Sequence, residues 1–157
     1  MTQRHEPEWL DEEERAAWIA LMTLFFRLPA ALDQQLRADS GMTHFDYQVM
    51  VILSGVPNRT LRMSELATLT EGSLPRLSQV VKRHEQSGWI ERRPDPDDGR
   101  STLAVLTDKG FDVLGAAAPG HVAEVRRLVF DPLSRTQVNQ LERIATRILA
   151  ARDVGPG

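Results

Sequence analysis

Apolar side chains recur every three or four residues in the first quarter of the chain. This spacing puts them on one face of a helix, so the sequence predicts an amphipathic helix of about eight turns over residues 9–38. Pro29 lies inside it and predicts a kink, or a split after Phe26, because proline lacks the N–H that a helix needs. A helix this long seldom buries its apolar face on one short partner, so we expect a second subunit to cover the remainder. The apolar positions are Trp18, Leu21, Met22, Phe25, Leu28, Leu32 and Leu36.

Three shorter helices are predicted next, each preceded by a hydroxyl residue that favours a helix N-terminus: Thr43, Ser64 and Ser73. The predicted helices span residues 43–54, 64–69 and 73–87. Gly88 follows the third helix in the position where glycine commonly ends one. The last two helices are separated only by a short turn, as in a helix-turn-helix.

A charged β-hairpin comes after these helices. Its arms are residues 90–94 and 101–106, and the tip at 95–100 contains Asp98-Gly99, a pair typical of hairpin turns. Residues 61–63 are too short for an independent strand, and we expect them to pair with a wing strand as a third edge. Two short helices followed by a two-stranded wing make a winged helix-turn-helix. The predicted fold class is therefore mainly α with a small β-wing.

Two further helices are predicted after the wing. The first begins after Thr107 and meets Gly115, Pro119 and Gly120, where we expect a bend or break. Ser134 with Gln137 matches a capping box and begins the second. Its apolar face is formed by Val138, Leu141, Ile144, Ala145, Ile148 and Leu149.

Composition excludes several classes of chemistry. The chain has 157 residues and no cysteine, which excludes disulfides, thiolate zinc sites and cysteine nucleophiles. No phosphate-binding glycine loop, serine nucleophile motif or metal-spaced histidine pair occurs, so we expect no enzyme activity, no cofactor and no metal. No apolar run approaches the roughly 18 to 20 residues that cross a bilayer, and the acidic N-terminus lacks a secretory signal. We therefore expect a cytoplasmic protein with no membrane partner.

Charge is unevenly distributed along the chain. The net charge is −3, yet residues 1–40 hold four basic and eight acidic residues, whereas residues 59–93 hold seven basic and four acidic ones. A positive patch on an acidic body can still neutralise phosphates locally. Nucleic acid is thus compatible with the composition, and its binding would depend strongly on salt.

The helix over residues 73–87 combines an apolar face with a polar one. Leu77, Val80, Val81 and position 84 follow the i, i+3, i+4, i+7 spacing and are predicted to point inward. Arginine can bind guanine and glutamine adenine in the major groove, while serine and lysine hold phosphate. The alternative is an ordinary solvated face, and the neighbouring helix and wing favour recognition over it. The polar face carries Ser73, Arg76, Ser78, Gln79, Lys82, Arg83 and Gln86.

The wing supplies three more candidate DNA contacts, Arg92, Asp98 and Arg100. Arg92 and Arg93 point to opposite sides of a strand, so one of them is expected to face phosphate. Arg100 at the tip suits the negative potential of a minor groove. We expect Asp98 to orient the Arg100 guanidinium by a bidentate pair, the alternative being an exposed ion pair worth about 0–1 kcal/mol.

His84 occupies a position on the apolar face where leucine would be expected. We expect a histidine at the edge of the core with one ring nitrogen bonded to the backbone. A pH-sensing role is the alternative.

Residues Gly88–Gly110 resemble the wing signature of the MarR family of bacterial transcriptional regulators. The matching features are the Asp98-x-Arg100 pair and the Leu106-Thr107-x-x-Gly110 exit. Residues 64–70 followed by residues 73–89 fit the family's helix-turn-helix, and the resemblance is sharp over about residues 62–110. His84 departs from the family's usual leucine. The resemblance implies one domain over residues 1–157, with a winged region at 43–110 and dimerisation helices at 9–38 and 111–152.

The resemblance also implies a function. Such proteins are homodimers that bind pseudo-palindromic operators, commonly as repressors, and many release DNA when a small aromatic or phenolic ligand binds. By analogy Trp18, Met22, His44 and Tyr47 would line the ligand pocket, unless Trp18 and Met22 are simply core residues. The competing hypothesis is a winged-helix module that binds protein and not specific DNA. The basic residues on its polar helix face and wing argue against that hypothesis.

Overall fold

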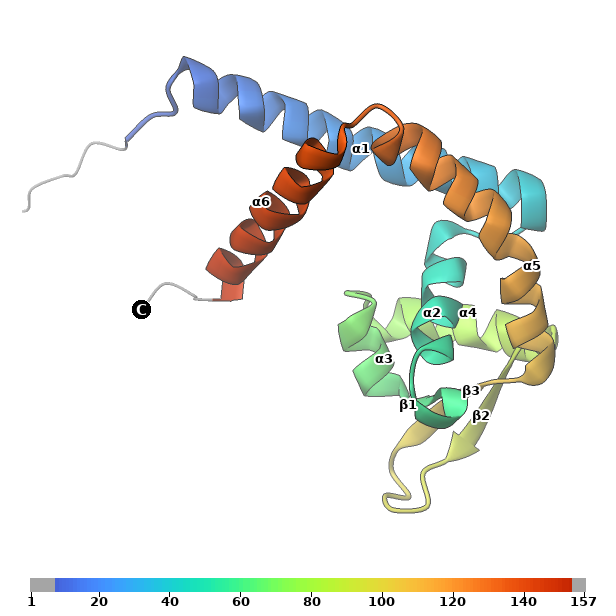
Figure 1. Cartoon of the computed structure of the whole chain (residues 1–157). Coiled ribbons are helices and arrows are strands. Elements are labelled where there is room, and N and C mark those ends of the chain that lie inside the picture. Colours follow the sequence, from blue (N-terminus) through green and yellow to red (C-terminus); the bar gives the residue numbers. More distant parts are fainter. Residues whose placement is uncertain (1–7, 154–157) are drawn as a thin grey trace, which may run out of the picture.

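A computed structural model describes residues 8–153, and it confirms a mainly helical chain with a small β-wing. Figure 1 shows a winged unit at one end, α1 and α5 running alongside each other, and α6 projecting away from the rest. The elements are α1 (Glu12–Ser40), α2 (His44–Ser54), η1 (Pro57–Arg59), β1 (Thr60–Arg62), α3 (Met63–Leu69), α4 (Leu74–Gln86), β2 (Ile90–Pro94), β3 (Thr102–Leu106), α5 (Asp108–Val125), η2 (Arg126–Phe130) and α6 (Arg135–Asp153).

The winged unit packs α2, α3 and α4 against the sheet. Leu77, Val80, Val81 and His84 are all buried, which confirms the predicted inward face of α4. They meet apolar side chains of α2 and α3, so burial of this face fixes which side of α4 is left to solvent. The central members of this core are Met50, Leu53, Leu66, Leu77, Val81, Ile90 and Ala104.

The sheet has the strand order β1-β3-β2 and is antiparallel throughout. Ile90 pairs with Leu106 and Pro94 with Thr102, so the two predicted wing arms do form a hairpin. The short strand β1 pairs with β3, which confirms the predicted third edge. The wing is thereby held to the helical core on its inner side, and its tip extends from it (Figure 1).

The predicted split of α1 and the predicted break in α5 are wrong, because both helices are continuous at these residues. Helix α1 runs unbroken from Glu12 to Ser40 with Pro29 inside it, and α5 runs through Gly115, Pro119 and Gly120. The two helices pack along each other, and this packing offsets the single hydrogen bond that each proline removes. The start of α1 is also later than predicted, because Asp11 caps it in a capping box with Glu14.

The N-terminal half of α1 has few contacts with the rest of the chain. Trp18 is 52% exposed and Phe26 73% exposed, whereas Leu32 and Leu36 further along are buried. Contrary to the sequence expectation, α1 is long and apolar enough to cross a membrane by length and composition alone. The first half of α1 thus has an apolar surface that the rest of this chain does not cover.

Gly110 is the glycine on which the wing-to-helix junction depends. A Cβ added there would lie 2.2 Å from the Trp89 carbonyl oxygen and 2.7 Å from Leu106 Cδ1. We expect Gly110→Ala to lower the free energy of unfolding by about 1–3 kcal/mol or more, since backbone atoms cannot move aside cheaply. Urea denaturation measures this change.

Gly115→Ala is the matched control. It lies in the same helix with nothing within 4 Å of the added Cβ, and alanine should stabilise the helix by roughly 1 kcal/mol. Equal effects of the two substitutions would contradict the close contact at Gly110.

Candidate nucleic-acid interface

The outward side of α4 is a polar surface of the winged unit. Gln79, Lys82 and Gln86 are exposed and, at 3.6 residues per turn, lie opposite the buried Leu77 and Val81. Ser73 caps the helix, its hydroxyl oxygen accepting the Arg76 N–H at 3.3 Å. Within residues 8–153 the amide and ammonium groups of these three side chains form no hydrogen bond or ion pair, so this side presents free donors, as a groove-reading surface requires.

Arg76 and Arg83 lie on one flank of α4 and not at the centre of this surface. The Arg76 guanidinium is 4.0 Å from the centre of the Phe45 ring, a cation–π contact with α2. Arg83 forms an ion pair with Asp46, also on α2. Both arginines are thus directed toward α2, although their side chains remain partly exposed.

The opposite flank of α4 borders a groove that reaches the wing. Three arginines, Arg62, Arg92 and Arg100, line it together with the hydroxyl residues Ser64 and Ser78. This combination suits phosphate oxygens. Arg62 and Ser64 were not among the predicted contacts. Ser64 was expected to cap α3, but the helix begins at Met63, so its hydroxyl is left for this groove.

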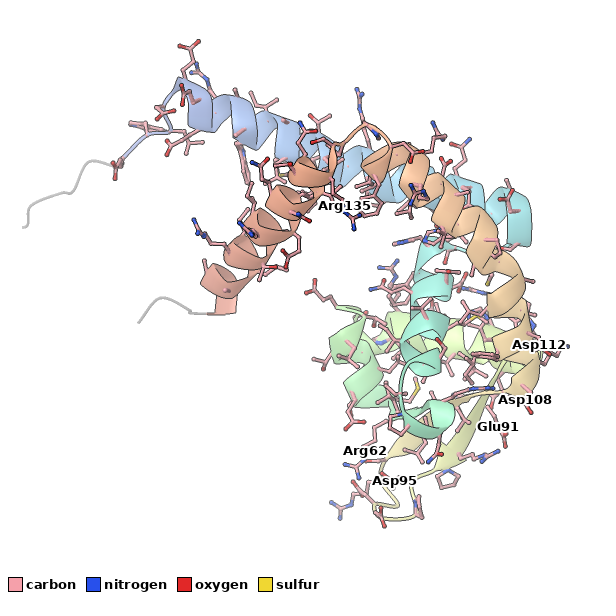
Figure 2. All side chains as sticks on the ribbon, in the orientation of Figure 1. Arg62, Glu91, Asp95, Asp108, Asp112 and Arg135 are labelled. Carbon is pink, nitrogen blue, oxygen red and sulfur yellow. The ribbon has the colours of Figure 1, made fainter. Side chains whose placement is uncertain are left out.

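Ion pairs fix the position of the wing against the helices. Arg92 binds Glu85 of α4 at 2.6 and 3.0 Å, while Arg93 binds Glu91. Arg62 contacts Asp95 at 2.6 Å, and the Asp95 side chain is 4% exposed. The backbone N–H of Asp97 and the Arg62 guanidinium hold the pKa of Asp95 below its ordinary value. Asp95 thus holds the start of the wing tip against β1, a role that the sequence did not reveal. Figure 2 shows Arg62 and Asp95 side by side at this end of the molecule.

The expected pairing of Asp98 with the Arg100 guanidinium is wrong. Asp98 Oδ1 accepts the Arg100 backbone N–H at 3.1 Å and Oδ2 accepts the Ser101 hydroxyl at 2.8 Å. Because a short aspartate reaches the backbone two residues ahead most easily, it shapes the turn instead. Within residues 8–153 the exposed Arg100 guanidinium forms no ion pair, so it is available for a phosphate or a groove.

His84 is fully buried, and its partner differs from the prediction. Its ring stacks on Trp89 with centroids 5.2 Å apart, and Nε2 lies 3.2 Å from Asp46 Oδ1, an ion-pair distance with angles outside those of a hydrogen bond. Neither ring nitrogen bonds to the backbone of the described residues. The sequence alone could not place Asp46 beside it, because the two residues are 38 positions apart.

The four predicted ligand-pocket residues do not come together in one chain. His44 and Tyr47 lie at the junction of α1, α2 and α5, where the His121 ring is 4.4 Å from Tyr47 and 5.8 Å from His44. His121 Nδ1 is 3.2 Å from Gln35 Oε1. Asp33 is the α1 residue that contacts His44. Along the axis of α1, Trp18 lies about 22 Å before Asp33, and Met22 lies about 16 Å before Asp33. Exposure of Trp18 also shows that it is not a core residue of this chain. No sequence pattern marked His121 or Gln35.

The two histidines at this junction make the fold sensitive to acid. Burial lowers the pKa of His44, and burial with the His44 charge lowers the pKa of His121. Above the unfolded pKa of about 6.5 both are neutral and cost nothing. As the pH falls below that value the unfolded chain takes up protons first, so stability decreases toward the folded pKa values.

We therefore expect the free energy of unfolding to decrease between pH 7.5 and pH 5.5. In His121→Gln the decrease should be smaller, because glutamine has no ionisable group and can still bond to Gln35. Urea unfolding at each pH measures both proteins. Equal pH dependence in the two proteins would exclude His121 as a contributor.

No group of three histidine, aspartate or glutamate side chains in the described part of the chain is arranged to hold a metal ion.

Comparisons with known proteins all indicate the same family. Residues 40–101 match the model of the MarR family. A MarR family regulator from Streptomyces coelicolor, Sco3205, solved in complex with DNA, is 42% identical with a TM-score of 0.87, covering 97% of this chain and 94% of its own. AbsC, a MarR family regulator from the same organism, is 33% identical with a TM-score of 0.86, covering 94% and 99%.

A curated relative extends the comparison. The transcriptional repressor MprA of Escherichia coli is 28% identical over 113 residues. The match covers 72% of this chain and 64% of that repressor.

Proposed function

Because the chain belongs to the MarR family of transcriptional regulators, we propose that it works in the cytoplasm as a homodimer that binds a pseudo-palindromic operator in duplex DNA. The observation that carries the proposal is the pairing of two surfaces on one side of the winged unit. The outward side of α4 bears Gln79 and Lys82, and the wing tip beside it bears the unpaired Arg100. Ser73, Ser78 and Arg92 border these surfaces and complete the proposed DNA contacts. Asp98 contributes by shaping the turn that carries Arg100.

A second copy of the chain accounts for the uncovered apolar surfaces. Within α6, every residue through Ala150 except Val138 is exposed, and the helix stands apart from the winged unit (Figure 1). A two-fold partner would cover these faces and bring two α4 helices to one DNA duplex. The same coverage explains the apolar length of α1 without a membrane. The exposed apolar residues include Trp18, Ile19, Phe25, Phe26, Val122, Ile144, Ile148 and Leu149.

The proposed mode of action is repression relieved by a small aromatic or phenolic ligand. The junction of α1, α2 and α5 supports this proposal, because His44 and Tyr47 offer ring faces and polar atoms between the helices proposed to dimerise and the winged unit. Trp18 and Met22 would contribute only if the second copy brings its α1 to this junction. Thermal-shift measurements with aromatic acids test binding, and Tyr47→Phe tests whether the phenol takes part.

Selection and sequencing of duplex DNA bound by the purified protein tests the function directly. The proposal expects two inverted half-sites and an affinity that falls steeply with salt. The competing function, a winged-helix module that binds protein, predicts no enriched sequence and no salt-dependent duplex binding. Transcription from the selected operator, with and without the protein, then distinguishes repression from activation.

A further inference from the structure

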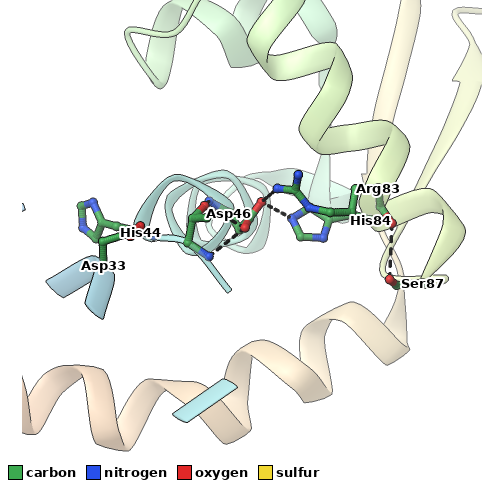
Figure 3. Close-up of polar contacts among 7 residues, drawn as sticks. Asp33, His44, Asp46, Arg83, His84 and Ser87 are labelled. Carbon is green, nitrogen blue, oxygen red and sulfur yellow. Dashed lines mark hydrogen bonds and ion pairs between the residues drawn. The ribbon is translucent and has the colours of Figure 1, made fainter. Parts of the chain in front are cut away.

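Asp46 joins the first turn of α2 to α4. Its side chain is 3% exposed, and its two oxygens have separate partners. Oδ2 accepts the Thr43 backbone N–H at 2.8 Å and the Thr43 hydroxyl at 2.7 Å, which caps α2. Oδ1 faces Arg83, with which it forms an ion pair, and His84 Nε2. Figure 3 shows Asp46 between the start of α2 and these two α4 residues.

A second carboxylate continues this connection to α1. Asp33 Oδ1 accepts the His44 backbone N–H at 2.9 Å, and Asp33 Oδ2 binds Arg37 within α1. The first turn of α2 is therefore held by α1 on one side and holds α4 on the other. Polar contacts thus run from the proposed dimerisation helix to the helix proposed to read DNA.

Because Asp46 is buried, water cannot readily replace its bonding partners. Burial by itself would raise the pKa of Asp46, but the adjacent His84 ring, hydrogen bonds from Thr43 and the ion pair with Arg83 hold that pKa well below its ordinary value. The carboxylate is thus charged at physiological pH and requires its partners, because an unpaired buried charge is strongly unfavourable. This ion pair directs the Arg83 guanidinium toward α2 and away from the outward side of α4 that carries Gln79 and Lys82.

We propose that Asp46 and Arg83 are positioning residues, which fix the orientation of α4 relative to α1 and so the separation of the two α4 helices in the dimer. Arg83 then acts through Asp46 and does not read a base. This inference rests on the proposed function, since the separation matters only for a dimer on two half-sites. It replaces the base contact that the sequence predicted for Arg83.

The test uses operators in which one base pair is inserted or deleted between the half-sites. Asp46→Asn keeps an oxygen for the α2 cap but removes the charge that holds Arg83. We expect it to weaken binding to the natural operator by roughly tenfold and to reduce the discrimination against altered spacing. Arg83→Ala should have the same effect, and the double variant should be no worse than either single one.

Thr43→Ala is the matched control. It removes the capping hydroxyl and leaves the contact between Asp46 and Arg83, so it should lower thermal stability while the spacing preference stays unchanged. Because the Arg83 side chain is 54% exposed, Arg83→Ala keeps the test available even if Asp46→Asn does not fold.

Base preference gives the second readout. Selection with Arg83→Ala should return the wild-type half-site sequence. A changed preference at one operator position would show that Arg83 reads a base, and unchanged spacing discrimination in both variants would show that the pair positions nothing. A wild-type protein that binds no duplex would instead overturn the proposed function itself, and the positioning role with it.

Discussion

A variant with Ile144 and Ile148 both replaced by glutamate is expected to be monomeric and to bind the operator about 100-fold more weakly or worse. Both side chains are more than half exposed in the single chain and lie on the apolar face of α6, so their replacement does not disturb the winged unit. Four glutamates brought together at a two-fold interface would repel one another and leave buried charges unpaired. A dimer gains avidity from two half-sites, of order 10²–10⁴, which a monomer loses.

Sedimentation velocity measures the change in mass, and fluorescence anisotropy with labelled operator measures the affinity. Arg143→Glu with Arg147→Glu, on the same helix, is the control for charge near α6 without loss of apolar side chains. If the isoleucine variant remained a dimer with full affinity, α6 would not belong to the interface.

Arg100→Ala and Gln79→Ala are expected to weaken binding in two different ways. The free Arg100 guanidinium at the wing tip would contact phosphate or the minor groove, so its loss should weaken binding to all duplexes and reduce the salt slope by about 1. Gln79 faces outward at the centre of α4, where it would read a base edge. Its loss should cost roughly 1–3 kcal/mol and relax the preference at one operator position.

Competition between specific and random duplex over a range of salt concentrations separates the two effects. Arg93→Ala is the control, because Arg93 is bound to Glu91 and does not line the groove. A base-specific loss in Arg100→Ala, or a uniform loss in Gln79→Ala, would reverse the assignments of wing and helix.

Sequence periodicity predicted the fold well wherever burial decides it. Leu77, Val80 and Val81 repeat at helical spacing because one side of α4 is buried in the core, so the spacing of apolar residues predicts which side that is. The hairpin could also be predicted from the sequence, since Asp98-Gly99 marks its turn. The flanking strands pair in the structure. Pro29 and Pro119 do not split their helices, because these helices pack against each other, and that support is not a local property of the sequence.

The polar contacts of the site were much less predictable. Arg76 and Arg83 occupy the polar side of α4 in the sequence, yet each is directed to a residue of α2 more than 30 positions away. Asp98 shows that even a neighbouring partner can be mistaken, because it accepts the backbone N–H of Arg100 and the Ser101 hydroxyl and does not pair with the Arg100 guanidinium. Periodicity gives the face of a helix, but the partner of a charge depends on tertiary neighbours.

Hydroxyl-radical footprinting of the selected operator tests most directly whether two α4 helices bind one duplex. The homodimer predicts two protected segments related by two-fold symmetry, with centres about 10 base pairs apart or a multiple of that. A single protected segment, or uniform weak protection along the duplex, would contradict the dimeric, sequence-reading protein proposed above.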